Sequence, residues 1–160
     1  RRAMALLQPK KGEIIIDFFS GLGNFTLPIA TFSSSVIGVE GDDALVESGR
    51  KNAEKNNLSE NINFVKVDLF NASQEDIKPL GNADKWLIDP PRDGAFNLIN
   101  LINSDIQPRR IVYISCNPAT LARDTAELVK AGYQLKSAGV MDMFPNTTHV
   151  ESMAVFDLAN

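Results

Sequence analysis

Several residue types and patterns are scarce in this chain, and each shortage excludes a class of protein. One cysteine in 160 residues allows no internal disulfide and no cysteine-ligated metal or iron–sulfur site. No apolar run approaches the roughly 20 residues that a membrane-spanning helix needs. The first residues also lack the apolar core of a signal peptide. These shortages predict a cytoplasmic protein that is not attached to a membrane.

Basic residues are not in excess either. The formal net charge is −4, whereas binding to nucleic acid usually shows as a basic field. Contact with RNA would then depend on local groups, for which Arg92 and Arg123 are candidates. Because 44% of the residues are hydrophobic, the chain can close one core of ordinary size. We therefore predict a single domain over residues 1–160.

Seven apolar runs are typical of β-strands, and helical segments separate the first six of them. The runs cover residues 13–19, 35–39, 62–67, 86–88, 110–115, 133–141 and 149–158. Helices are predicted within residues 1–11, 24–32, 42–56, 71–82, 97–103 and 118–131. The last two runs are joined by a segment too short for a helix. Five βα units followed by such a strand pair predict an α/β fold with a mostly parallel sheet, one antiparallel strand and helices on both faces.

Unusual polar groups follow the predicted strands at their carboxyl ends, where open α/β sheets bind ligands. The glycine turn Gly21-Leu22-Gly23-Asn24-Phe25-Thr26 follows the first strand. Glu40 ends the second strand, roughly 20 residues after the first glycine, which suits an acid that binds the ribose hydroxyls of an adenosine cofactor. That cofactor can be NAD or S-adenosylmethionine. Because Thr26 stands where a dinucleotide site has its third glycine, docking of a pyrophosphate is disfavoured.

Further acids at this edge of the sheet favour S-adenosylmethionine, which is a cation and has no phosphate. Asp68 ends the third strand, where it can accept a hydrogen bond from the adenine amino group. Asp89 follows the fourth strand, near the ammonium or the sulfonium, and Asn24 lies beside the amino-acid end. Each residue also has a plainer interpretation: Asp68 can be a turn residue, Glu40 a surface acid and Phe19 part of the core.

Cys116 directly follows the fifth apolar run, and a helix is predicted to begin two residues later. Asn117 suits the N-cap of that helix and Pro118 suits its first position. Cys116 would therefore lie at the positive end of a helix dipole, which favours a thiolate. A cysteine between apolar residues is more often packed and inert. Beside a methyl donor, however, a thiolate has one well-defined use: it adds to C6 of a pyrimidine so that C5 can take the methyl group.

Such a reaction also needs a base that removes the proton left on C5. The segment that enters the last predicted strand contains the only histidine of the chain, His149, and a carboxylate, Glu151. Either residue can instead be an ordinary polar residue of a loop or strand face. The pattern alone leaves both interpretations open.

Five blocks of the sequence resemble the catalytic domain of the RNA 5-methyluridine (uracil-C5) methyltransferases, and most of all the bacterial 23S ribosomal RNA branch. The blocks span residues 17–28, 38–40, 88–92, 115–124 and 141–152. The resemblance implies a Rossmann-like class I S-adenosylmethionine-dependent methyltransferase fold, with Cys116 as the nucleophile at C6 and Glu151 as the base. It places the cofactor contacts on Phe19, Asn24, Glu40, Asp68 and Asp89. It implies no metal site in this chain.

The ribosomal members of that family also carry an N-terminal RNA-binding barrel and an iron–sulfur segment. Neither is present in these 160 residues, so we expect the chain to be a fragment. The predicted function is methyl transfer to C5 of a uridine flipped out of folded RNA, with 23S rRNA as the substrate and a tRNA uridine as the alternative. Two other functions stay open. One is an NAD-linked oxidoreductase with the same glycine turn, and the other is a non-catalytic fragment that binds the cofactor or RNA.

Overall fold

A computed structural model describes residues 1–33, 35–141 and 150–159, and its centre is a seven-stranded sheet in the order β3-β2-β1-β4-β5-β7-β6. The strands are β1 (Ile14–Phe18), β2 (Ser35–Glu40), β3 (Ile62–Lys66), β4 (Lys85–Ile88), β5 (Arg110–Ser115), β6 (Tyr133–Met141) and β7 (Glu151–Leu158). Strands β1 to β5 pair in parallel, and β7 pairs antiparallel with both of its neighbours, β5 and β6. The predicted mostly parallel sheet with one antiparallel strand is confirmed.

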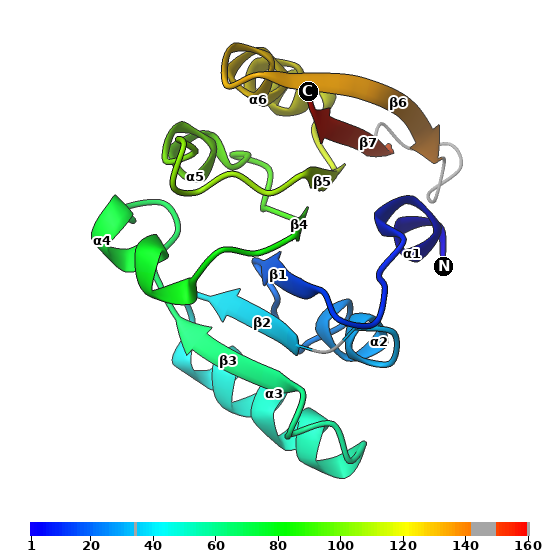
Figure 1. Cartoon of the computed structure of the whole chain (residues 1–160), viewed down its shortest axis with the longest axis vertical. Coiled ribbons are helices and arrows are strands. Elements are labelled where there is room, and N and C mark those ends of the chain that lie inside the picture. Colours follow the sequence, from blue (N-terminus) through cyan, green and yellow to red (C-terminus); the bar gives the residue numbers. More distant parts are fainter. Residues whose placement is uncertain (34, 142–149, 160) are drawn as a thin grey trace.

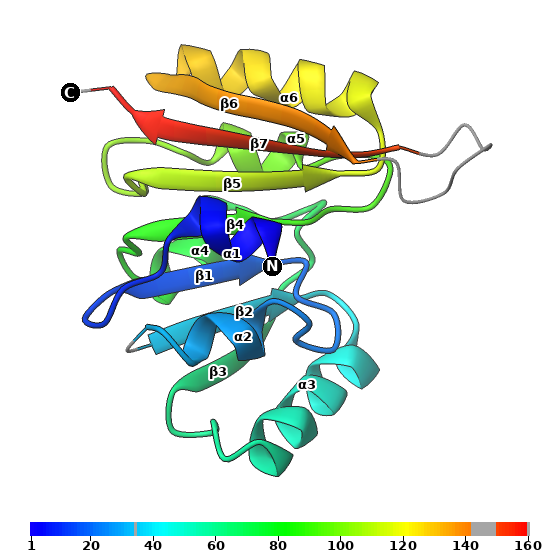
Figure 2. The same ribbon diagram turned by 90° about the vertical axis from the view of Figure 1, so that its right-hand side faces the viewer.

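Helices cover both faces of this sheet (Figures 1 and 2). One face carries α1 (Arg2–Leu7), α2 (Thr26–Ala30) and α3 (Asp43–Lys55), and the other carries α4 (Gln74–Ile77), the 3-10 turn η1 (Lys78–Leu80), α5 (Phe96–Asn100) and α6 (Pro118–Lys130). Neighbouring strand residues point to opposite faces, so Ile15 packs under the first group and Ile16 under the second. Trp86 is buried, as expected, with its ring edge-on to Phe18.

Helix ends differ most from the predicted boundaries. The first helix ends at Leu7 because Gln8 turns to a left-handed conformation, with a φ of 50°. The short helix predicted within 71–82 divides at residue 78, since Pro79 has no N–H to continue an α-helical ladder and a 3-10 turn follows. In the last strand, regular pairing begins at Glu151, and His149 lies outside the described residues.

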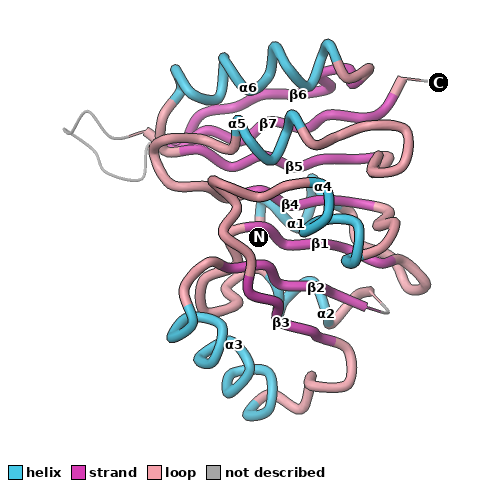
Figure 3. The backbone as a smooth tube through the Cα atoms, turned by 90° about the vertical axis from the view of Figure 1, so that its left-hand side faces the viewer, coloured by secondary structure: helices cyan, strands magenta, loops and turns pink. Residues whose placement is uncertain are grey.

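The sheet order creates a crevice between β1 and β4. These strands are neighbours, yet the chain runs from β1 outward through β2 and β3 and, after β4, outward on the other side. Loops at the carboxyl ends of the two strands therefore separate, and open α/β sheets bind ligands at such a point. The tube view in Figure 3 follows the chain through this reversal. Within the described ranges, no helix is both long and apolar enough to cross a membrane.

Candidate functional site

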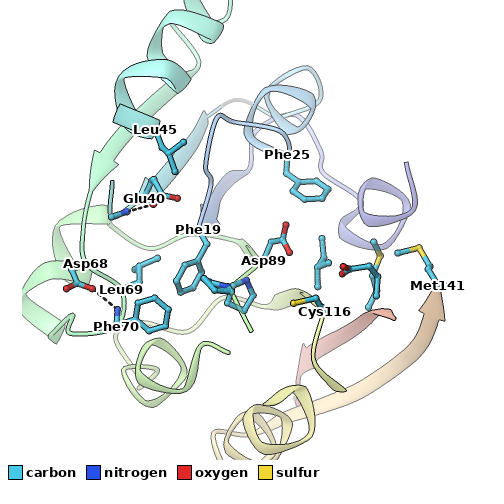
Figure 4. A pocket seen from close by; sticks show the side chains of 16 residues that line it. Phe19, Phe25, Glu40, Leu45, Asp68, Leu69, Phe70, Asp89, Cys116 and Met141 are labelled. Carbon is cyan, nitrogen blue, oxygen red and sulfur yellow. Dashed lines mark hydrogen bonds between the residues drawn. The ribbon is translucent and has the colours of Figure 1, made fainter. Parts of the chain in front are cut away.

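A cavity of about 650 Å³ lies at the carboxyl edge of the sheet (Figure 4). Its lining brings together six of the seven predicted site residues, which are Phe19, Glu40, Asp68, Asp89, Cys116 and Glu151. They come from six different strand ends. Asn24, the seventh, is exposed in the glycine turn and is not one of the described residues that line the cavity. Its predicted contact with a cofactor stays a prediction.

Glu40 holds the glycine turn against the end of β2. Its Oε2 accepts a hydrogen bond from the Gly21 N–H at 3.0 Å, and its Oε1 accepts from the N–H groups of Gly41 and Asp42 at 2.7 and 3.1 Å. A carboxylate offers about four acceptor sites, so Glu40 keeps capacity for a further donor in the cavity. The turn itself requires glycine at Gly23, which has a φ of +89° and where a Cβ would approach Leu27 Cδ1 to 2.5 Å.

An aromatic wall lines the next part of the cavity. Phe19 has a positive φ of 61°, which is unusual for a bulky residue and marks local strain that often occurs at functional sites. Its ring lies 5.6 Å from the ring of Phe70, tilted by 57°. Phe70 is 47% exposed, so the two rings offer an open apolar surface to a flat ligand.

Asp68 is both a turn residue and a residue of the cavity. Its Oδ2 accepts a hydrogen bond from Asn71 Nδ2 at 2.8 Å, and its Oδ1 accepts from the Phe70 N–H at 3.1 Å. These hydrogen bonds, the one from Asn71 first, hold the pKa of Asp68 below its ordinary value. Asp68 is therefore a carboxylate at neutral pH and can accept a hydrogen bond from an amino group.

Negative charge accumulates at the centre of the site. Burial raises the pKa of Asp89 to about 6, and the nearby charge of Glu151 adds to the effect. Asp17 of β1 is fully buried, and this burial, together with the charges of Asp89 and Glu40, raises its pKa to about 7. Thr26 Oγ1 opposes the rise because it donates a hydrogen bond to Asp17 Oδ2 at 2.5 Å. The other oxygen, Oδ1, finds no hydrogen-bond partner in the described part of the chain. Such a group of carboxylates fits a cationic ligand, which would lower their pKa values.

Cys116 and Glu151 both lie next to the last residue pair of β5 and β7. Ser115 is the last residue of β5 and pairs with Ser152 in the antiparallel ladder. The next positions along the two strands are Cys116 and Glu151, and Glu151 pairs with Met141 of β6 on its other side. Both are partly buried and both line the cavity. Residues that are 35 positions apart in the sequence are therefore brought to the same place by the register of two strands.

The start of α6 holds Cys116 in position. The Asn117 side chain accepts a hydrogen bond from the Ala119 N–H at 3.1 Å, and Pro118 is the first helical residue, so the predicted cap is confirmed. Arg123 pairs with the buried Asp124, whereas the Arg92 side chain is exposed. Neither arginine is among the described residues that line the cavity.

Several lining residues were missed in the sequence analysis. Besides Gly41, they are Phe25, Leu45, Leu69, Phe70, Pro90, Pro91, Ile114, Met141 and Met153. Pro90 and Pro91 follow Asp89 directly, so their position after a strand was a usable signal. For the other residues the signal is absent, because an apolar residue that lines a cavity looks like a core residue in sequence. Among the described residues there is no group of histidine, cysteine and acidic side chains that could hold a metal ion.

Comparisons with known proteins identify the family of this chain. Residues 2–158 match the family described as tRNA (Uracil-5-)-methyltransferase. The chain is 54% identical over 159 residues to the 23S rRNA (uracil(1939)-C(5))-methyltransferase RlmD of Dechloromonas aromatica. The alignment covers 99% of this chain and 37% of that protein. The RlmD protein of Azoarcus sp. is 53% identical, with 98% of this chain and 36% of the relative covered. The chain thus spans little more than a third of the length of these relatives.

Solved structures show the same fold. The tRNA (uracil-54, C5)-methyltransferase of Pyrococcus abyssi, in complex with S-adenosyl-L-homocysteine, aligns with a TM-score of 0.79 at 32% identity and covers 97% of this chain and 37% of its own. TrmN from Thermus thermophilus aligns with a TM-score of 0.77 at 20% identity, and the alignment covers 99% of this chain and 47% of TrmN. At this identity the likeness shows the fold alone. The expected Rossmann-like class I methyltransferase fold is confirmed. With its sequence matched from residue 2 to residue 158, this chain belongs to the tRNA (uracil-5-)-methyltransferase family.

Proposed function

We propose that this chain is the catalytic part of an enzyme that transfers a methyl group from S-adenosylmethionine to C5 of a uridine in RNA. One observation carries the proposal: Cys116, directly after the paired end of β5, and Glu151, the first residue of β7, line one cavity with Asp89. The reaction requires a thiolate, a base and a cationic methyl donor in the same cavity. The names of the ribosomal relatives favour 23S rRNA as the substrate, and a tRNA uridine is the alternative.

The lining of the cavity fits S-adenosylmethionine part by part. Glu40 is placed to accept from the ribose hydroxyls, and Asp68 from the adenine amino group beside the rings of Phe19 and Phe70. Asp89, with the buried Asp17 behind it, supplies negative charge for the cationic part. When bound, the cofactor supplies an electrophilic methyl group on its sulfonium. Asn24 would bind its amino-acid end from the glycine turn.

The reaction on the base follows from two residues. The Cys116 thiolate adds to C6 of uracil, and the ring electrons then make C5 nucleophilic enough to take the methyl group. C5 now carries both a methyl group and a hydrogen. Glu151 removes that proton, the C5–C6 double bond forms again, and the Cys116 sulfur leaves. The thiolate is thereby regenerated, and the proton remains on Glu151 until it passes to solvent.

Both carbons of the base must be reached from the cavity, so the uridine has to leave its helix or loop stack. The exposed side chain of Arg92, four residues from the end of β4, is a candidate partner for an RNA phosphate near the mouth of the cavity. We infer a cytoplasmic location from the RNA substrate. An iron–sulfur cluster, where a family member has one, would be held outside these 160 residues.

A direct assay decides the function. The whole protein that contains this chain is incubated with labelled S-adenosylmethionine and either unmodified 23S rRNA or unmodified tRNA, and the nucleosides are analysed by mass spectrometry. We expect 5-methyluridine in the 23S rRNA. Product in tRNA alone would move the substrate to the alternative, and no 5-methyluridine in either RNA would overturn the proposal. Calorimetry provides the contrast with an oxidoreductase, for which NADH would bind and S-adenosylmethionine would not.

Glu40→Gln is expected to weaken binding of S-adenosylmethionine by about 10- to 100-fold, because hydrogen bonds to a charged group contribute about 1.5–3 kcal/mol. Isothermal titration calorimetry measures the change in Kd. Glu47→Gln is the matched control, since Glu47 lies exposed on α3 and pairs only with Lys51 in the described contacts. Equal Kd values for the two variants would contradict a role of Glu40 in cofactor binding.

Cofactor discrimination should depend on pH. Above pH 6 Asp89 is ionised and attracts the sulfonium of S-adenosylmethionine, whereas the product S-adenosylhomocysteine has a neutral sulfur. As the pH falls through about 6, Asp89 takes up a proton and this attraction is lost. We expect the ratio of the product Kd to the cofactor Kd to rise about three- to tenfold between pH 5 and pH 7.5. Asp89→Asn should flatten this profile, and an unchanged slope in that variant would contradict the assignment.

A further inference from the structure

Asp124, on α6, is a buried carboxylate that the proposed reaction does not use. Its side chain is fully buried. Its Oδ2 accepts hydrogen bonds from the Tyr113 hydroxyl at 2.6 Å and from the Ala95 N–H at 2.7 Å, and its Oδ1 accepts from Arg123 Nε at 2.8 Å. The Ala95 N–H also donates to the Tyr113 hydroxyl at 3.0 Å. Asp124 therefore joins α6, β5 and the loop that follows β4.

That loop is bound to the first turns of α6 along most of its length. The Arg92 carbonyl accepts hydrogen bonds from Asn117 Nδ2 at 3.0 Å and from Thr120 Oγ1 at 3.2 Å. One residue later, the Asp93 carbonyl accepts from Arg123 at 2.8 Å. Three helix side chains thus hold two consecutive loop carbonyls.

Gly94 shows how closely the loop and the helix approach each other. Its φ is +79°, and a Cβ built there would lie 2.6 Å from both an Arg123 nitrogen and Asp124 Oδ2. Any larger residue would push the loop off α6. The contact is therefore a fitted backbone-to-side-chain junction rather than a loose surface contact.

The two elements that meet at this junction, the loop after β4 and α6, each adjoin a residue of the proposed reaction. The loop begins with Asp89, Pro90 and Pro91, which line the cavity, and Cys116 lies directly before the cap of α6. We propose that Asp124 is a positioning residue for methyl transfer. It holds the loop of residues 92–95 on α6 and thereby keeps the distance between Asp89 and Cys116 constant. This inference rests on the proposed function.

The network is well suited to that task. Burying a carboxylate costs free energy unless it is paired with a cation and hydrogen-bonded, and here one cationic and two neutral donors surround Asp124. Replacing the carboxylate by an amide leaves one acceptor oxygen for the Tyr113 hydroxyl, the Ala95 N–H and Arg123, and such polar networks rigidify only when they are complete. A displacement of about 1 Å between reacting groups can cost about 100-fold in rate.

Asp124→Asn, Tyr113→Phe and Thr120→Val test the junction in the whole protein that contains this chain. We expect kcat for 5-methyluridine formation to fall about 10- to 100-fold in Asp124→Asn and about three- to tenfold in the other two variants. The Kd of S-adenosylhomocysteine should stay within about threefold of wild type, because Glu40 and the aromatic wall lie on other elements. A parallel loss of kcat and cofactor affinity in all three would overturn the proposal.

Two variants control for loss of stability alone. Asp157→Asn breaks another partly buried ion pair, with Arg110 at 2.7 Å, at the opposite edge of the sheet. Thr31→Val removes a hydroxyl that donates to the Pro28 carbonyl at 2.7 Å. Even if Asp157→Asn and Thr31→Val lower the melting temperature as much as the junction variants do, both controls should keep the wild-type kcat. If Asp157→Asn lowers kcat as much as Asp124→Asn, the role of Asp124 is only structural.

Alkylation of Cys116 separates this inference from the proposed function, because it needs no RNA. The rate of reaction with iodoacetamide is followed at the Cys116 peptide by mass spectrometry, with and without saturating S-adenosylhomocysteine. We expect the protection by the bound product to fall at least about threefold in Asp124→Asn but not in Asp157→Asn. Unchanged protection would overturn the inference. If the wild-type protein makes no 5-methyluridine, the proposed function fails while the protection ratio still decides whether Asp124 couples the two sides.

Discussion

Cys116→Ala should abolish the formation of 5-methyluridine and leave the binding of S-adenosylmethionine intact. Without the sulfur no bond forms to C6, and C5 of uracil stays too weakly nucleophilic to take a methyl group. We expect kcat to fall by about 10⁴ or more, as when other enzymes lose their nucleophile. Turnover is measured as 5-methyluridine by mass spectrometry, and cofactor binding by calorimetry.

Cys116→Ser is the closer control, because it keeps the size of the side chain and loses the acidity of the thiol. It should be nearly as inactive as the alanine variant, since a serine hydroxyl is a weak nucleophile without an adjacent base. Both variants should melt near the wild-type temperature, because Cys116 is only partly buried. Turnover by either variant within about tenfold of wild type would remove Cys116 from the mechanism.

Glu151→Gln should have the opposite effect on the covalent intermediate. Addition to C6 and methylation of C5 can still occur, but a glutamine does not take up the C5 proton and the sulfur cannot leave. We expect a protein–RNA adduct that survives denaturation and accumulates to about one equivalent per active protein, while turnover falls about 100-fold or more. Denaturing gel electrophoresis with labelled RNA measures the adduct.

The double variant Cys116→Ala/Glu151→Gln provides the matched control for the adduct. It keeps the glutamine and removes the atom that forms the bond, so the shifted gel band should disappear. A band that remains would show that another side chain bonds to RNA. No band in Glu151→Gln together with normal turnover would mean that a different group removes the proton.

Local patterns were sufficient for the elements of this fold. The apolar runs predicted all seven strands, and the limits of β5 and β6 agree with the structure. Asn117 and Pro118 predicted the start of α6 because capping depends on residues that are close in the chain. The first helix ends earlier than predicted, because Gln8 takes a left-handed conformation, whereas the short helix predicted within 71–82 is present as α4.

The resemblance to a family narrowed the choice of candidate site residues further than periodicity did. Acids after a strand pointed to a ligand edge, yet on pattern alone Glu40, Asp68 and Glu151 were also compatible with surface roles. Glu40, Asp68 and Glu151 line the cavity, which supports the choice of these three acids as site residues. Asn24, in contrast, is exposed in the glycine turn. The exposed turn position had no signal in the sequence, because the direction of a side chain in a glycine turn depends on its backbone angles.

By itself, the sequence determined the order of helices and strands, the caps, and which strand ends carry reactive or acidic groups, since all of these follow from neighbours along the chain. Only the tertiary structure decided which of those ends meet. The antiparallel register that places Ser115 opposite Ser152 brings Cys116 and Glu151 into the lining of one cavity, and the buried Asp124 joins α6 to the loop after β4. The physical reason is that strand order, register and burial depend on contacts between residues far apart in sequence, which no local pattern contains.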